Sequence, residues 1–223
     1  MTRFDTDALI DRLAGDATPV RRIVPAWRRV LGWLCLGLPP ALAIIAFHGL
    51  ATGLPALLGD GQFVVEQAAA LATAAAAAAA AFASTIPGTD RRWLWLPAIP
   101  LVIWLLTLGR GCLNDWLRMG QEGLALRPDF ECFGPMLLMA VVPAAAMLLM
   151  LRRGAPLAPR TTLLLGALAT ASVVAFGLRF FHIGDASIMV LVWHMGLAAV
   201  LTVAASLAGP RALGWPVAAH LGP

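Results

Sequence analysis

Along this chain of 223 residues, polar and charged side chains are largely confined to short segments between long apolar runs. A helix of about 20 predominantly apolar residues crosses the hydrocarbon core of a bilayer. Runs of about this length predict six spans, at Val30–Leu50, Phe63–Ile86, Trp93–Leu108, Phe133–Leu151, Thr161–Phe181 and Ser187–Ala208. We therefore predict an all-α protein: a polytopic transmembrane bundle of six helices with a short N-terminal cytoplasmic helical arm.

The segments between the runs are short, at most about 30 residues, which is too little chain for an independent soluble domain. We predict a partner-binding arm at 1–29, a transmembrane domain at 30–208 and a short cytoplasmic tail at 209–223. The first run is too long for the apolar region of a signal peptide and lacks a small-residue cleavage motif after it. We therefore expect it to remain as a span.

Composition supports the membrane assignment. The chain is 60% hydrophobic and 13% charged, with a mean hydropathy of +0.82, whereas soluble domains carry about 25% charged residues. All 16 basic residues are arginine, which suggests the coding bias of a GC-rich bacterial genome and carries no functional inference.

The arginines predict the orientation. Loops on the cytoplasmic side of a membrane carry an excess of Lys and Arg. Twelve of the arginines fall before the first run, in alternate loops or in the tail, and four fall on the other side. Both termini are therefore expected in the cytoplasm of a bacterial inner-membrane protein, and the long loop 109–132 outside.

Small and helix-breaking residues distinguish individual runs. The second run contains Ala74–Ala81 without interruption, and small residues let membrane helices approach closely, so this helix is expected at the centre of the bundle. Prolines lie in the first, third and fourth runs, at Pro39, Pro40, Pro97, Pro100 and Pro143. They fit either packing kinks or the broken helices of a small-solute transporter.

Ionisable residues are scarce within the runs. Glu66 and His48 lie near predicted helix ends, and His194 lies in the sixth run. His194 fits either an interhelical hydrogen bond or a relay or ligand.

Two cysteines flank the predicted external loop. Cys112 and Cys132 lie on the oxidising side, where they fit either a disulfide or redox-responsive pair, or two unpaired thiols. Cys35 is expected to act as a small apolar residue. A membrane redox protein would use external cysteines, but the chain has no C-x-x-C pair. A zinc site would need His182 and Asp185 to converge on the two thiols.

The motifs of catalysis and nucleotide binding are also missing from the sequence. We therefore predict no enzyme activity, no cofactor, no metal and no direct contact with nucleic acid. The sequence does not specify an oligomeric state.

The arm has its own helical pattern. Asp5 and Thr6 suit a helix N-terminus, and Leu9, Ile10 and Leu13 fall on one face. A helix of about ten residues is marginal in water, so the apolar face needs lipid, the protein's own loops or a cytosolic partner. The arm then becomes basic, at Arg21, Arg22, Arg28 and Arg29, where it is expected to lie against the anionic leaflet.

Several short stretches resemble a known family. "LIDRLAGDATPVRR", "GCLNDW", a cysteine at the start of the fourth run, "LRRGAPL" and "WH" in the sixth run are similar to the NrsF family, bacterial inner-membrane anti-sigma factors that act on extracytoplasmic-function (ECF) sigma factors. The resemblance covers nearly the whole chain and implies six spans. It also implies that the arm holds the sigma factor through Leu9, Ile10, Leu13, Asp16, Pro19, Val20 and Arg21.

The same resemblance implies that external cysteines respond to stress, with heavy metals or oxidants as candidate signals. Cys132 matches this pattern. Family members often carry a further cysteine after a histidine in the last external loop, whereas here Ile183 follows His182. Cys112 is then the external thiol left to pair with Cys132.

The sequence hypothesis is an anti-sigma factor that sequesters an ECF sigma factor and releases it on an external redox or metal signal. Because the arm is short, help from Arg91, Arg92, Arg152 and Arg153 is expected, although these arginines also fit a role in topology alone. The alternatives are a small-solute transporter and a membrane redox protein.

Overall fold

The computed structural model describes residues 6–16, 24–48, 54–120, 133–154, 156–180 and 195–213. Within these ranges all regular structure is helical, as predicted. The elements are α1 Thr6–Gly15, α2 Ala26–His48, α3 Leu54–Leu58, α4 Gly61–Ala83, η1 Arg91–Trp95, α5 Ala98–Met119, α6 Phe133–Arg152, α7 Pro159–Leu178 and α9 Gly196–Ala212.

Five helical stretches are long and apolar enough to cross a membrane: Ala26–Phe47, Gly61–Ala83, Arg91–Met119, Gly134–Arg152 and Pro159–Leu178. They correspond to the first five predicted runs. The sixth run is described only from Met195 onward, and α9 contains a shorter apolar stretch, Ala198–Gly209. A sixth complete span therefore stays a prediction.

The third predicted run was placed too short. It was expected to end at Leu108, with a loop from 109, but α5 continues to Met119. Gly109 and Gly111 lie inside this helix, where a glycine costs only about 1 kcal/mol. Gly111 is buried, and Leu108 just before these glycines packs in a cluster with Ala69 and Ala70 of α4. The helix stops at Gly120, whose φ of 61° is readily adopted by glycine.

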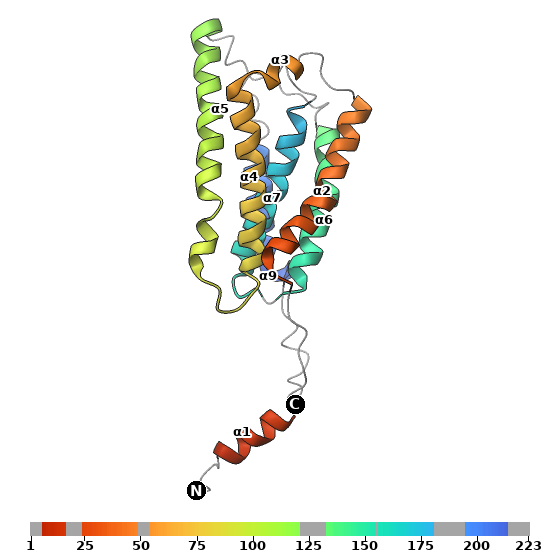
Figure 1. Ribbon diagram of the computed structural model, residues 1–223, viewed down its shortest axis with the longest axis vertical. Coiled ribbons are helices and arrows are strands. Elements are labelled where there is room, and N and C mark those ends of the chain that lie inside the picture. Colours follow the sequence, from red (N-terminus) through yellow and green to blue (C-terminus); the bar gives the residue numbers. More distant parts are fainter. Residues whose placement is uncertain are drawn as a thin grey trace.

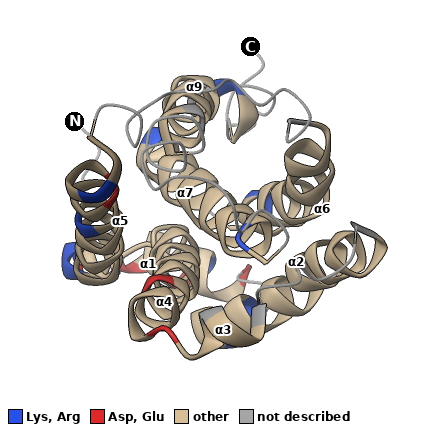
Figure 2. Ribbon diagram, turned by 90° about the horizontal axis from the view of Figure 1, so that it is seen from above, with Lys and Arg blue, Asp and Glu red and all other residues tan. Residues whose placement is uncertain are grey.

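The alanine-rich helix α4 is central, as its sequence predicted. It packs against α7, α5 and α2, and Figure 2 shows it among these helices. Ala74, Ala77, Ala78 and Ala81 are completely buried, which is possible because their small side chains let neighbouring backbones approach. α6 packs against α2 and α7, and α9 packs against α7, so that α5 and α6 lie on different sides of the bundle (Figure 2).

The arginines are unevenly divided between the two ends of the bundle. We call one end of the bundle the basic end. At this end α2 and α7 start, and α4, α6 and α9 finish (Figure 1). Its exposed arginines are Arg28, Arg91, Arg92, Arg152, Arg153, Arg160 and Arg211. The opposite, far end carries Arg110, Arg118 and Arg179. The start of α2 and the end of α9 thus share the end that the sequence assigns to the cytoplasm.

Arg29 was predicted to lie against the lipid leaflet, but this prediction is wrong. The residue is buried, with an exposed fraction of only 7%. Its guanidinium donates to the carbonyl oxygen of Met150 at 2.6 Å, to Thr85 Oγ1 at 3.0 Å and to the carbonyl of Phe82 at 3.4 Å. It also lies 4.3 Å from the centre of the Phe82 ring. The last carbonyls of a helix lack intrahelical partners and attract a cation, so one side chain of α2 stabilises the ends of both α4 and α6.

Three close contacts support this arrangement. The Trp33 indole of α2 donates to the carbonyl oxygen of Pro143 in α6 at 2.9 Å, which makes the proline of the fourth run a packing residue. Gly154 lies so close to Thr85 that a Cβ atom on it would come within 2.6 Å of Thr85 Oγ1. The hydroxyls of Ser84 and Thr162 meet at 2.8 Å and join the end of α4 to the start of α7.

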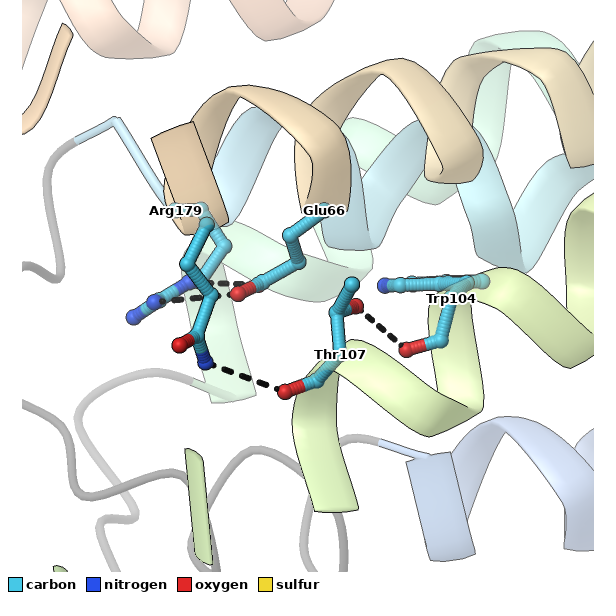
Figure 3. Close-up of polar contacts among 5 residues, drawn as sticks. Glu66, Trp104, Thr107 and Arg179 are labelled. Atoms are coloured by element: carbon cyan, nitrogen blue, oxygen red, sulfur yellow. Dashed lines mark hydrogen bonds and ion pairs between the residues drawn. The ribbon is translucent and has the colours of Figure 1, made fainter. Parts of the chain in front are cut away.

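At the far end, an ion pair joins the same two helices (Figure 3). Arg179 Nε donates to Glu66 Oε1 at 2.9 Å, and the two side chains are 15% and 5% exposed. Gln62 of α4 donates to the carbonyl oxygen of Thr107 in α5 at 3.1 Å. α4 is therefore held by polar contacts to α7 at both of its ends.

Replacing Arg29 is expected to destabilise the bundle. Arg29→Ala leaves Thr85 Oγ1 and the Met150 carbonyl without their charged donor, which should lower the free energy of unfolding by about 2–4 kcal/mol. Unfolding of the detergent-solubilised protein, followed by circular dichroism, measures this loss. The matched control is the exposed neighbour Arg28→Ala, which should cost less than about 1 kcal/mol. Equal losses in both variants would show that Arg29 has no special structural role.

The far-end ion pair makes a second prediction. Glu66→Gln leaves the mostly buried Arg179 without its counter-ion and should cost about 2–3 kcal/mol in the same assay. Adding Arg179→Gln removes the unpaired charge, so the double variant should be more stable than the sum of the two single losses implies. Arg92→Gln, which breaks only the exposed pair with Asp90, should change stability by less than about 1 kcal/mol. Additive single losses would contradict the coupling.

Candidate partner-binding site

The short helix α1 carries the predicted apolar face. Leu9, Ile10 and Leu13 are 50%, 55% and 63% exposed, and no residue of α1 is buried. The helix begins at Thr6, has Asp7 in its first turn and Arg12 in its last, an arrangement that suits the helix dipole. The structure therefore has a helix at Thr6–Gly15 whose apolar side chains are exposed, while its role as a partner-binding arm stays a prediction.

The chain after α1 is only partly described. The amide of Asp16 donates to the carbonyl of Arg12 at 3.0 Å and extends the last turn. Asp16 itself is exposed. Pro19, Val20 and Arg21, which were also predicted to bind the partner, lie outside the described residues. The structure thus brings Leu9, Ile10, Leu13 and Asp16 onto one short helix and its end.

The basic end offers a second surface. Arg91, Arg92, Arg152 and Arg153, which the sequence suggested as helpers of the arm, are all exposed there. Two of them have partners at this end: Arg92 pairs loosely with Asp90, at 3.8 Å, and Arg152 Nε donates to the carbonyl of Ala212 at 3.1 Å.

Exposed tryptophans accompany these arginines. Trp27, Trp93 and Trp95 are 59%, 47% and 76% exposed, and Arg28 stacks 5.1 Å from the centre of the Trp27 ring. Tryptophan is enriched where a membrane meets water. The basic end therefore has the composition of a membrane–water boundary as well as a charge that attracts anionic partners.

The candidate thiols are described only in part. Cys112 lies within α5 rather than at a loop edge, is half-buried and carries a free thiol. Cys132 lies outside the described residues, immediately before the start of α6. Cys35 is exposed on α2, as a cysteine facing lipid would be.

His182, Asp185 and His194 also lie outside the described residues. Among those that are described, no cluster of three His, Cys, Asp or Glu could hold a metal.

Sequence reasoning missed two residues that organise the bundle. Arg29 was grouped with the surface arginines because its neighbour Arg28 has the same charge, and nothing local distinguishes the two. Arg179 could have been paired with Glu66, since both were placed near the external ends of predicted runs and an isolated charge is costly inside a membrane. Neither residue belongs to the predicted partner-binding set.

This chain matches a known protein family over nearly its whole length. No curated protein and no solved structure matches it. Residues 13–215 match the model of a family described as the negative regulator of sigma F. This match over most of the sequence shows that the chain belongs to the NrsF family.

Proposed function

We propose that this protein is a membrane-anchored anti-sigma factor that sequesters an ECF sigma factor at the bacterial inner membrane. The family description implies a sigma factor as the partner and a regulatory, non-enzymatic role. In this proposal both termini lie in the cytoplasm, and the basic end faces the cytosol together with α1.

The uncovered face of α1 carries the proposal. Leu9, Ile10 and Leu13 are half or more exposed, although a helix of this length gains most of its stability from burying its apolar side. Asp7, Asp11 and Asp16 disfavour contact with an anionic leaflet. A groove on a cytosolic protein suits such a helix, with the apolar side chains as anchors. Pro19, Val20 and Arg21 are assigned to the same contact on the strength of the family resemblance.

The exposed arginines of the basic end support the arm. Arg91 and Arg153 protrude at this end, where they would meet acidic side chains of a captured sigma factor. Such contacts mainly increase the rate of association and suppress wrong partners. The sigma factor held here is kept from RNA polymerase.

Release is proposed to start at the external thiols. Cys112 is carried by α5, and Cys132 directly precedes α6 in sequence. We propose that a disulfide between them, whose Cα atoms must come within about 7 Å, changes how α5 and α6, which lie on different sides of the bundle (Figure 2), pack at the far end. Signalling needs such a second packing, whose population the signal changes.

The transporter alternative has no specific observation in its favour. A solute carrier needs a polar site near the middle of the membrane. The cavity between α6, α7 and α9 is instead lined almost entirely by apolar side chains, and the proline of α6 accepts an interhelical hydrogen bond.

The arm is tested by charge substitutions on its two faces. Leu9→Asp/Leu13→Asp should weaken the affinity for the sigma factor by on the order of a hundredfold, because two leucines are no longer buried. The control Ala8→Asp places one such charge on the opposite face of α1 and should leave the affinity nearly unchanged, and Leu9→Asp alone, which adds the same single charge to the apolar face, should weaken it. Co-purification from the native bacterium, with the sigma factor identified by mass spectrometry, compares the four proteins. An unchanged partner list, or labelling that places the N-terminus outside the cell, would refute the proposal.

The thiols are tested separately. Oxidant treatment of cells should produce a Cys112–Cys132 cross-linked peptide within one chain and reduce the amount of sigma factor that co-purifies. Cys112→Ser and Cys132→Ser should each abolish both effects, whereas Cys35→Ser should abolish neither. Both thiols found free after treatment, by mass analysis without reductant, would eliminate this release mechanism while leaving capture by α1 intact.

A further inference from the structure

A long apolar cavity lies between α6, α7 and α9. Its volume is about 470 Å³, and its walls include Met147 and Leu148 of α6, Gly166 and Val174 of α7, and Leu201 and Ala205 of α9. Two hydroxyl side chains, Thr170 and Thr202, also line it. Thr170 already donates to the carbonyl oxygen of Gly166 at 3.0 Å. The cavity thus favours a ligand that is hydrocarbon along most of its length.

The cavity is elongated along the bundle. Its lining runs on α7 from Leu163 to Leu178 and on α9 from Ala198 to Ala212. At 1.5 Å per residue each stretch is roughly 20 Å long, a large part of the hydrocarbon thickness of a bilayer. This shape matches an extended acyl chain that lies parallel to the helices.

The three helices that form the cavity walls carry arginines at the basic end of the bundle. Each contributes one exposed arginine: Arg152 ends α6, Arg160 is the second residue of α7 and Arg211 lies in the last turn of α9. Arg152 donates to the carbonyl oxygen of Ala212, which is itself part of the cavity wall. The Arg152 guanidinium is thus next to one end of the apolar space, on the helix ends that also carry Arg160 and Arg211.

Close backbone packing holds two of these arginines near each other. A Cβ atom added to Gly209 would lie 2.7 Å from the carbonyl oxygen of Pro159. The end of α9 therefore meets the start of α7 closely. Arg211 comes two residues after Gly209, and Arg160 comes directly after Pro159.

We propose that this site binds one anionic phospholipid of the adjacent leaflet, with an acyl chain in the cavity and its phosphate at Arg160 and Arg211. An arginine near an anionic headgroup contributes about 1 kcal/mol, and its guanidinium can hold two phosphate oxygens at once. A zwitterionic lipid fits the cavity equally well but has no net charge for the arginines. The site is therefore selective for headgroup charge, and it is independent of sigma-factor capture.

The test is lipid retention by the purified full-length protein. Micelles containing equal amounts of phosphatidylglycerol and phosphatidylcholine, with identical acyl chains, are offered to the protein, and bound lipids are counted by native mass spectrometry. The wild type should retain one phosphatidylglycerol in preference to phosphatidylcholine. Arg160→Gln/Arg211→Gln should reduce its affinity for phosphatidylglycerol about fivefold for each arginine removed. Equal retention of the two lipids by the wild type would overturn the proposal.

Two matched controls separate this site from the general charge of the basic end. Arg91→Gln/Arg92→Gln removes the same charge from η1, which packs against α4, and should retain phosphatidylglycerol like the wild type. Ala205→Trp fills the cavity and should lose retained lipid at least fivefold, whereas Ala204→Trp, at an exposed neighbouring position outside the cavity lining, should not. An equal loss of lipid in Arg91→Gln/Arg92→Gln would overturn the site, and so would equal lipid retention by the two tryptophan variants. A further variant, Ala205→Cys, tests whether a second copy of the chain covers this face instead. A disulfide between two copies of that variant would also overturn the site.

Discussion

The basic end of the bundle depends on the need to satisfy helix-terminal carbonyl groups away from water. The Met150 carbonyl near the end of α6 and Thr85 just beyond α4 both receive hydrogen bonds from Arg29. Each such group left unpaired within a membrane protein costs several kcal/mol. A single guanidinium with five fixed donors can serve both helices at once, which a lysine could not do with the same geometry. The crossing of α2, α4 and α6 is therefore set by a polar group in a largely apolar protein.

The apolar runs were sufficient to predict most of the fold. Their length is set by bilayer thickness, and the uninterrupted alanines of α4 indicated its central position before any contact was known. The extent of α5 was not predictable in the same way. Gly109 and Gly111 look like a helix end locally, whereas in the structure α5 runs through both of them and ends at Met119.

Site residues were predictable where the signal is local and unpredictable where it is not. The face formed by Leu9, Ile10 and Leu13 follows from helical periodicity alone, and the structure leaves it exposed. In contrast, Arg28 and Arg29 are adjacent and identical in type, yet one stacks on Trp27 at the surface and the other is buried. Which of the two turns inward depends on the positions of Thr85 and Met150, which are 56 and 121 residues away in the chain. The resemblance of short stretches to NrsF proteins, by comparison, agreed with the family match over residues 13–215.

The bond from the Trp33 indole to the carbonyl of Pro143 has a mechanical consequence. Trp33 lies about one helical turn from Arg29 along α2, and both residues bind α6. Two attachments at different depths prevent α2 from rotating about its own axis without carrying α6 along. Because Arg29 also binds Phe82 and Thr85 at the end of α4, a movement of the first membrane helix at the basic end is coupled to α4 as well as to α6.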